Sequence, residues 1–335
     1  MYSSEVMVRP RCRYRVRSRW LFTASIFVFG LVSILTLRRH TSSRSRTILF
    51  DSVAPYRGRS YIGTRATYKF NHSPPNGTCV LTRKDTATFV ILVGSAPHHF
   101  PLRNAIRGTW GREARNSGFV VVFVTGKPPP SSKEYEWQLG LDTEAAVNRD
   151  ILQGTFIGTY GTMTMLNILG LKWAAEACGS ADFLVKISDD TYLNVKRLKQ
   201  SFENVRYKSA VVYARVDNSD THWNGHRLAR ARQSICVPCG YALSMDVVPM
   251  LFNSSLTGSF NSMEDLFWAH TTGTTVKLES LLDFGTYIRG VTTQCEVRNL
   301  ITSHQLNAYD MEVMWRELRN ANSSCSPSNK DEGFR

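Results

Sequence analysis

Short apolar segments with many β-branched residues alternate with helical segments between residues 87 and 214. The segments 87–94 and 118–126 are apolar almost throughout, as expected for strands that are buried on both faces. Further strands are predicted at 150–152, 182–187 and 210–214, with helices at 163–178 and 193–205. This alternation predicts an α/β fold, in which a mostly parallel sheet is covered by helices on both faces. No Gly-x-Gly-x-x-Gly motif follows the first strand, so the fingerprint of a dinucleotide-binding fold is absent.

Two acidic residues, Asp189 and Asp190, follow the predicted strand at 182–187. Ligands of parallel sheets bind beyond the carboxyl ends of the strands. Carboxylates at such a place are costly to bury unless they face solvent or a cation. Hard oxygen ligands suit Mg²⁺ or Mn²⁺, which can in turn hold a diphosphate. The alternative is a solvated turn in which one of the two aspartates caps the next helix.

An uncharged segment of 18 residues, 20–37, lies near the N-terminus. As a helix it would be roughly 27 Å long, close to the thickness of the hydrocarbon layer of a membrane. Six arginines alternate through 9–19, so the positive-inside rule predicts a cytoplasmic tail over 1–19 and a transmembrane signal-anchor over 20–37. The alternative is a cleaved signal peptide, but no small-residue cleavage site follows the segment.

The chain carries 41 basic and 27 acidic residues, a formal net charge of +14. Residues 1–46 contain ten Arg and one Glu, which contribute +9 of that excess. The other 289 residues carry only +5, so we expect no nucleic-acid partner.

Sequons and cysteines indicate a secretory compartment. Asn-x-Ser/Thr sequons occur at Asn71, Asn76, Asn253 and Asn322. Six cysteines follow the predicted membrane segment, at positions 79, 178, 236, 239, 295 and 325. Cys236 and Cys239 form a Cys-x-x-Cys pair that could indicate zinc or redox chemistry, but no second pair of this spacing exists. We therefore expect structural disulfides. Residues 38–85 lack an apolar period and are predicted to be a lumenal stem before one domain over 86–335.

Several stretches between residues 89 and 318 resemble, in order, the motifs of glycosyltransferase family 31, the β1,3-galactosyltransferase and β1,3-N-acetylglucosaminyltransferase group. They are Arg-x-x-Ile-Arg-x-Thr-Trp at 103–110, Lys-Ile-Ser-Asp-Asp-Thr-Tyr-Leu-Asn at 186–194, Gly-Tyr-Ala-Leu-Ser at 240–244, Glu-Asp-Leu at 264–266 and an ending at 295–318 with His304 and Trp315. The sequence departs from the family pattern at Ser188, where the first Asp of an acidic triplet is usual, and at Gly158, which also replaces an Asp.

The resemblance implies a GT-A-like fold and a catalytic domain over 86–335. It also implies transfer of a hexose from a UDP-sugar donor, with inversion, to a glycan acceptor on protein or lipid in β1,3 linkage. UDP-galactose is the expected donor, Mn²⁺ the expected cation, and the Golgi membrane the expected location, with type II topology. One alternative is an N-acetylglucosaminyl- or N-acetylgalactosaminyltransferase. Another is a glycan-binding homologue without activity, which is suggested by Ser188 in place of the first Asp of the triplet.

Roles for individual residues follow from the same resemblance. Asp190 and His304 are the expected metal ligands, and Asp189 is expected near the ribose or a metal-bound water. Asp265 is the expected catalytic base, with Glu264 positioning it; the alternative is a charged helix N-terminus. Donor binding is assigned to Asp189 together with Lys186, Arg103 and Arg107. The alternative for the two arginines is structural salt bridges, and Trp110 is expected in the core.

Overall fold

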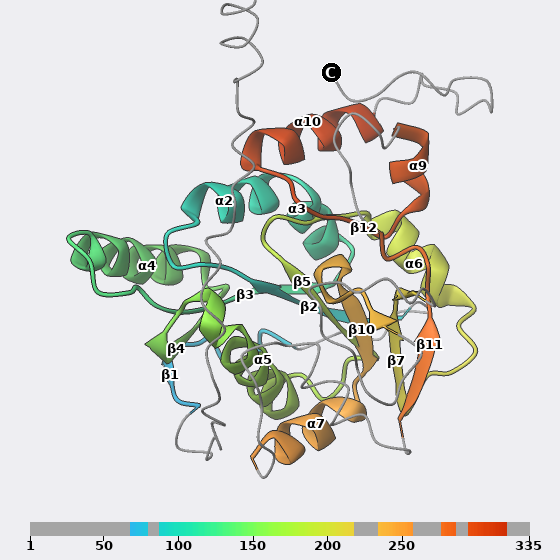
Figure 1. Cartoon of the computed structure of the whole chain (residues 1–335), viewed down its shortest axis with the longest axis horizontal. Helices are drawn as coiled ribbons and strands as arrows, with labels where there is room; N and C mark the ends of the chain where they lie inside the picture. The colour runs from blue at the N-terminus through green and yellow to red at the C-terminus, as the bar shows by residue number, and fades with distance from the viewer. Residues whose placement is uncertain (1–67, 80–86, 218–233, 257–275, 286–293, 320–335) are drawn as a thin grey trace, which may run out of the picture. The chain divides into compact units, whose positions relative to one another are not determined.

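The computed structural model describes residues 68–79, 87–217, 234–256, 276–285 and 294–319, all of which lie in one compact unit, 58–335 (Figure 1). Among these residues, no helix combines the length and hydrophobicity that crossing a membrane requires. The segment predicted to be a signal-anchor, 20–37, lies outside them. The described part therefore tests the fold of the predicted domain but not the membrane prediction.

A central sheet of eight strands forms the middle layer of this unit (Figure 1). Its strands are β1 (Phe70–His72), β2 (Phe89–Gly94), β3 (Val120–Lys127), β4 (Ile151–Ile157), β5 (Phe183–Ser188), β7 (Val211–Ala214), β10 (Tyr241–Ser244) and β11 (Lys277–Ser280). Their order is β1-β4-β3-β2-β5-β10-β7-β11. The four strands β4, β3, β2 and β5 are parallel, whereas β10 is antiparallel to both of its neighbours and β1 is antiparallel to β4. The predicted mixed α/β fold with a mostly parallel sheet is confirmed.

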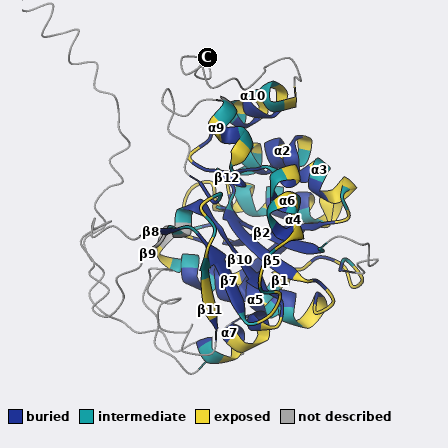
Figure 2. Cartoon of the chain, turned by 90° about the vertical axis from the view of Figure 1, so that its right-hand side faces the viewer, coloured by how far each residue is buried: buried dark blue, intermediate teal, exposed yellow. Residues whose placement is uncertain are grey.

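Helices cover both faces of the sheet, as predicted. They are α2 (Phe100–Gly108), α3 (Trp110–Asn116), α4 (Glu134–Asn148), α5 (Met163–Ala177), α6 (Val195–Glu203), α7 (Val247–Ser255), α9 (Gln294–Asn299) and α10 (Ala308–Arg319). Apolar side chains of α2, α3, α6 and α10 form one core on one face, and those of α5 and α7 form a second core on the other. Neighbouring residues of β5 alternate between the two, since Phe183 and Val185 join the first core and Leu184 the second. Figure 2 shows the resulting band of buried strands.

Several elements differ from the sequence prediction, among them α7, α9 and β11, which were not predicted. Helix α4 was not predicted, because its exposed positions include Tyr135, Leu139 and Val147 and leave no clear apolar stripe. Strand β10 was not predicted either; it is four residues long and pairs antiparallel with β5 and β7. Strand β1 lies inside the range predicted to be a stem, and it pairs with β4. The folded unit therefore includes the end of the predicted stem.

Disulfides secure two places in this unit. One joins Cys79, after β1, to Cys178 at the end of α5. The other joins Cys236 to Cys239 across the short helix η3 (Val237–Cys239). Cys295 is also disulfide-bonded. The prediction of disulfides is confirmed for the four described cysteines whose pairs are resolved here.

Candidate active site

The acid turn, residues 189–191, lies at the carboxyl edge of the parallel strands. Strands β2 and β5 are parallel neighbours, and their last residues, Gly94 and Ser188, face each other across the pair. The backbone N–H of Asp189 donates to the carbonyl of Gly94 over 3.0 Å. The chain leaves β2 into a polar loop, residues 95–99, so this loop and the acid turn meet at one edge of the sheet. The predicted position of the acidic pair is confirmed.

Asp189 is held by the polar loop. Its carboxylate is almost fully buried and accepts a hydrogen bond from the Ser95 hydroxyl at 2.7 Å. His99 Nδ1 lies 2.9 Å from the same oxygen, Oδ2. The hydrogen bond to Asp189 raises the pKa of His99 above its ordinary value, although burial opposes this. The Ser95 hydroxyl and the His99 ring therefore hold the side chain of Asp189 in place.

Asp190 is in a different environment. Its carboxylate is half-buried, and burial raises its pKa, with a further contribution from the charge of Asp189. Its described hydrogen-bond donors are its own backbone, the Thr191 hydroxyl at 3.5 Å and the backbone of Gln305, and no described Lys or Arg pairs with it. Neither aspartate caps the next helix, because Asn194 accepts from the N–H of Arg197 at the start of α6. The capping alternative for the acidic pair is therefore wrong.

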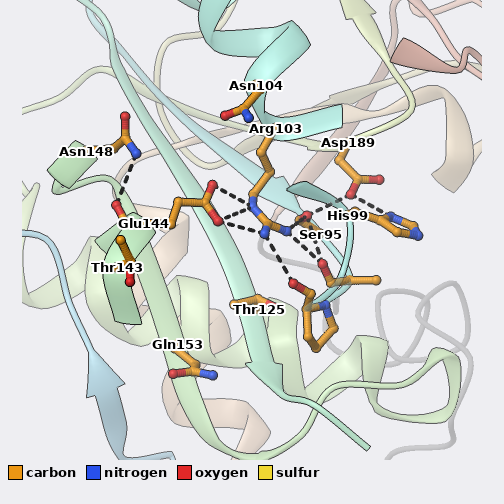
Figure 3. A network of polar contacts seen from close by, with 12 residues as sticks. Ser95, His99, Arg103, Asn104, Thr125, Thr143, Glu144, Asn148, Gln153 and Asp189 are labelled. Carbon is orange, nitrogen blue, oxygen red and sulfur yellow. Dashed lines mark hydrogen bonds and ion pairs between the residues drawn. The ribbon is translucent and has the colours of Figure 1, made fainter. Parts of the chain in front are cut away.

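Arg103 connects the polar loop to α4 (Figure 3). The side chain is fully buried, and its Nε and Nη2 donate to the carboxylate of Glu144. Nη1 donates to the Ser95 hydroxyl at 2.8 Å and to the carbonyl of Ala96, and Nη2 donates to the carbonyl of Pro97. All of the guanidinium's donor directions are thus used inside the protein. The geometry favours the structural salt bridge over direct contact with UDP.

Arg107 has a similar role one helical turn further along α2. Its Nε and Nη2 donate to the two carboxylate oxygens of Asp150, at 2.9 and 2.7 Å. Its Nη1 donates to Glu144 and to Asn104. Trp110, fully buried as predicted, donates its indole N–H to the carbonyl of Thr191 at 3.1 Å. The 103–110 motif therefore holds the polar loop through Arg103 and the acid turn through Trp110.

Lys186 and His304 belong to elements other than the polar loop. Lys186 is buried within β5, where it lines a small cavity against α5 together with Asn167 and Tyr241. His304 follows the short strand β12 (Thr302–Ser303), which pairs with β6 (Tyr192–Leu193) just after the acid turn. Burial lowers the pKa of His304. Among the described residues, the group of possible metal ligands that includes His304 consists of His304, Cys236 and Cys239 and contains no carboxylate.

The predicted base, Asp265, and its neighbour Glu264 lie in 257–275, outside the described residues. Their roles remain predictions. The residues that sequence reasoning missed are on the polar loop and α4: Ser95, His98, His99, Trp137 and Glu144. The available signal was the position of Ser-Ala-Pro-His-His directly after the first buried strand, at the edge where the acidic pair was expected.

His98 illustrates what that signal omits. Its ring stacks on Trp137 of α4, with centroids 4.8 Å apart and an interplanar angle of 26°. Its pKa is lowered, first by burial and then by the neighbouring His99. The loop therefore carries two adjacent histidines with opposite pKa shifts. Nothing in the local sequence predicts the contact with Trp137, which is 39 residues away and belongs to an unpredicted helix.

Comparisons with known proteins agree with the sequence resemblance. The profile of the family described as Galactosyltransferase matches residues 102–277. Beta-1,3-galactosyltransferase 4 of Mus musculus is 40% identical over 111 residues, which are 32% of this chain and 29% of that protein. The Homo sapiens protein of the same name is 26% identical over 271 residues, 68% of this chain and 72% of that one. Beta-1,3-galactosyltransferase 1 of Mus musculus is 24% identical over 308 residues, 85% of this chain and 91% of that one.

Among solved structures, a glycosyltransferase involved in the glycosylation of the major capsid of PBCV-1 is 10% identical, with a TM-score of 0.38, over 67% of this chain and 98% of that one. The first relative is matched over less than a third of its length, at 29%, whereas the family profile spans more than half of this chain. The chain therefore belongs to the galactosyltransferase family.

Proposed function

We propose that this protein is a hexosyltransferase that transfers galactose from UDP-galactose to a hydroxyl of a glycan acceptor, with inversion and in β1,3 linkage. The observation that carries the proposal is the acid turn at the carboxyl end of β5, where Asp189 and Asp190 stand beside the polar loop inside the family's domain. The names of the relatives, beta-1,3-galactosyltransferases 1 and 4, support galactose as the sugar.

The acid turn fits a divalent cation. Asp190 offers a half-buried carboxylate that forms no ion pair with a described Lys or Arg, and its pKa is raised first by burial and then by the charge of Asp189. Carboxylate oxygens are ligands that Mn²⁺ prefers. In this proposal Asp190, with His304 as a further candidate, would hold Mn²⁺. The ion would stabilise the negative charge that develops on the diphosphate of the leaving UDP.

The remaining roles belong to the chain's own side chains. Ser95, His99 and the buried Arg103 fix the carboxylate of Asp189 so that it faces the donor in one orientation. Asp265 takes the proton of the acceptor hydroxyl as that oxygen attacks the anomeric carbon, and Glu264 positions it. Ser188 leaves the acid turn with two carboxylates instead of three. These two carboxylates suffice in a mechanism in which the last of them, Asp190, is the metal ligand.

A donor screen tests the proposal. The full-length protein is incubated with UDP-galactose, UDP-N-acetylglucosamine or UDP-N-acetylgalactosamine, simple glycan acceptors and Mn²⁺, and the release of UDP is measured. We expect acceptor-dependent release with UDP-galactose that EDTA abolishes, and a β1,3 linkage in the product. Release with another donor would change the assigned sugar. Binding of UDP-sugar without turnover by a folded protein would instead favour the glycan-binding homologue.

A variant separates the base from the donor site. Asp265→Asn should bind UDP in the presence of Mn²⁺ as tightly as the wild type, while transfer falls by about 100-fold or more. Asp142→Asn is the matched control, because Asp142 lies on α4 and pairs with His72. Near-normal transfer by Asp265→Asn would reject the assigned base and leave the family assignment intact.

We also propose that the protein is a single-pass type II protein of the Golgi membrane, anchored by 20–37, with its catalytic domain in the lumen. The support is the uncharged segment, the arginines before it and the pairing of the described cysteines. In sealed microsomes, residues 47–335 should resist added protease until detergent is present. Digestion without detergent would reject this topology.

A further inference from the structure

Cys236, Cys239 and His304 form a compact cluster of possible metal ligands outside the acid turn. The two Sγ atoms and one ring nitrogen of His304 all lie within 4.8 Å of one another. Cys239 is fully buried, His304 is 6% exposed and Cys236 is half-buried. The cluster is therefore reached from solvent on the side of Cys236. In the present state the two cysteines are joined in a disulfide.

The backbone around these side chains is fixed on two sides. Thr302, just before His304, donates its hydroxyl to the carbonyl of Cys239. Gly240 has φ of +86°, and a Cβ there would lie 2.8 Å from Ile187 Cγ2 and 3.1 Å from the Lys186 carbonyl. Only glycine fits this conformation and this close approach to β5. The turn that carries Cys239 is thus packed against β5 on one side and β12 on the other. The fold therefore positions the three ligand atoms before any metal ion binds.

The imidazole of His304 supplies an independent sign of a ligand. Its Nε2 is buried and has no hydrogen-bond partner among the described residues. Buried polar atoms are satisfied in the great majority of cases, so such an atom needs an explanation. The second disulfide offers a contrast, because no His, Asp or Glu of the described chain completes a ligand group with Cys79 and Cys178.

We propose that reduction of the disulfide between Cys236 and Cys239 converts this cluster into a Zn²⁺ site, with two thiolates and the His304 imidazole as ligands and the fourth position open toward solvent. A dithiol reductant supplies two electrons and two protons, which break the S–S bond and leave two thiols, while the dithiol becomes a disulfide. Zn²⁺ then binds the two sulfurs as both thiol protons leave. This inference does not depend on the proposed transferase activity.

The chemistry of the donors selects the metal. Thiolate and imidazole ligands suit Zn²⁺, whose sites are tetrahedral, whereas Mn²⁺ prefers carboxylates and water. The cluster therefore favours Zn²⁺, whereas the acid turn favours Mn²⁺. His304 is a candidate ligand at both places. In the oxidised protein the sulfurs are bonded to each other and cannot bind as thiolates, so the site exists only after reduction.

The test uses Co²⁺ as a spectroscopic substitute for Zn²⁺. The full-length protein is reduced with dithiothreitol, which is removed anaerobically, and is titrated with Co²⁺. We expect thiolate-to-cobalt charge-transfer absorption that saturates at one equivalent and disappears when Zn²⁺ is added, and no such absorption from the oxidised protein. His304→Gln should weaken Co²⁺ binding by about 10-fold or more. Cys236→Ser with Cys239→Ser should remove the band, and the matched pair Cys79→Ser with Cys178→Ser should keep it.

A measurement on the wild type makes the outcome independent of how the variants fold. Zn²⁺ should slow the alkylation of Cys236 and Cys239 in the reduced protein, as measured by mass spectrometry of their peptides. Equal alkylation rates with and without Zn²⁺ would overturn the proposal. So would a charge-transfer band that survives in the Cys236→Ser and Cys239→Ser variant, or an unchanged affinity in His304→Gln.

Discussion

Asp190 has a pKa that is raised, first by burial and then by the charge of Asp189. Its pKa in the folded state is therefore higher than in the unfolded chain, so folding is most favoured at low pH and loses stability as the pH rises through the folded value. At neutral pH the ionised carboxylate destabilises the metal-free protein. A cation would bind to this same ionised carboxylate. Asp190 therefore lowers the stability of the metal-free protein but favours metal binding.

We predict that Asp190→Asn raises the free energy of unfolding at pH 7 in EDTA while lowering Mn²⁺-dependent UDP release by about 100-fold. Urea denaturation and the donor assay measure the two effects. Asp142→Asn should do the reverse and lower stability with activity retained, since hydrogen bonds from His72 and Gln138 lower the pKa of Asp142 in spite of burial. A destabilised Asp190→Asn protein would contradict the prediction.

His99 should also make stability fall as the pH rises, in the range above pH 6.5. Its hydrogen bond to Asp189 raises its pKa above the ordinary 6.5. The added stability is therefore complete below pH 6.5 and is lost as the pH rises through the folded value. His99→Gln should lower the free energy of unfolding at pH 6 but not at pH 9, by at most about 1 kcal/mol, because the ring is 37% exposed and screened by solvent. Equal losses at both pH values would contradict this role.

Among single residues, the sequence predicted those whose chemical type and place next to a buried strand both indicate a site. An acidic pair after a buried strand is visible in the sequence, and the structure has it at the predicted edge. Ser95 and His99 carry no such signal, because their importance comes from contacts with Asp189 that span 94 and 90 residues. Periodicity reports local structure and contains no information on such pairs.

Among the elements, the Arg103 network joins α2, α4 and the polar loop. Removing one partner of a buried ion pair leaves an uncompensated charge, which costs about 3–5 kcal/mol. Arg103→Lys should cost about 3 kcal/mol, because an ammonium group cannot replace the planar fork that reaches Glu144, Ser95 and two carbonyls. Urea denaturation gives the value. The exposed Arg112 supplies the control, Arg112→Lys, which should change stability by less than about 0.5 kcal/mol.

A loss below 1 kcal/mol in Arg103→Lys would show that the network contributes little. Arg103→Met combined with Glu144→Leu provides a further comparison. Because both charges are then removed, the double change should cost less than the sum of the single changes.

Gly158, where the resemblance has an Asp, is explained by its close packing against strand β3 and the polar loop. A Cβ at this position would lie 2.9 Å from the Gly126 nitrogen, 3.0 Å from its Cα and 3.3 Å from Pro97 Cγ. Two of these atoms belong to backbone, which yields little, so Gly158→Ala should cost about 1–3 kcal/mol. Gly179→Ala is the matched control, because a Cβ there meets no atom within 4 Å. Thermal unfolding compares the two, and equal melting temperatures would mean that this close approach is unimportant.

The elements that were predicted from the sequence are those with a clear local pattern of apolar residues. Strands β2, β3 and β5 are apolar on both faces, so each was found. Helix α4 rests largely on polar contacts such as Glu144 with Arg103, and β1 and β10 are short strands that depend on their partners. Their formation is decided by tertiary contacts, which a local pattern does not contain.

For the whole molecule, the described sequons differ in how well they present their side chains. Asn76 is exposed in a turn, with the hydroxyl of Thr78 donating to the Pro75 carbonyl. Asn71 lies in β1 and donates to Gln153. Asn253 is on α7, where Ser255, the third residue of its sequon, is fully buried and bonded to the Phe252 carbonyl. An oligosaccharide is bulky and belongs on an exposed loop, so the fold favours Asn76.

A lumenal domain should therefore carry a glycan at Asn76 and none at Asn253. In protein made in a eukaryotic secretory system, an endoglycosidase should increase the electrophoretic mobility of the wild type. Asn76→Gln should remove one step of that shift, and Asn253→Gln should leave it unchanged. Because the transferase that adds these glycans acts only in the lumen, an unglycosylated Asn76 in folded, membrane-associated protein would count against the proposed type II topology. A glycan at Asn253 would instead mean that α7 forms only after the sequon has been modified, since the buried Ser255 hydroxyl is inaccessible in the finished fold.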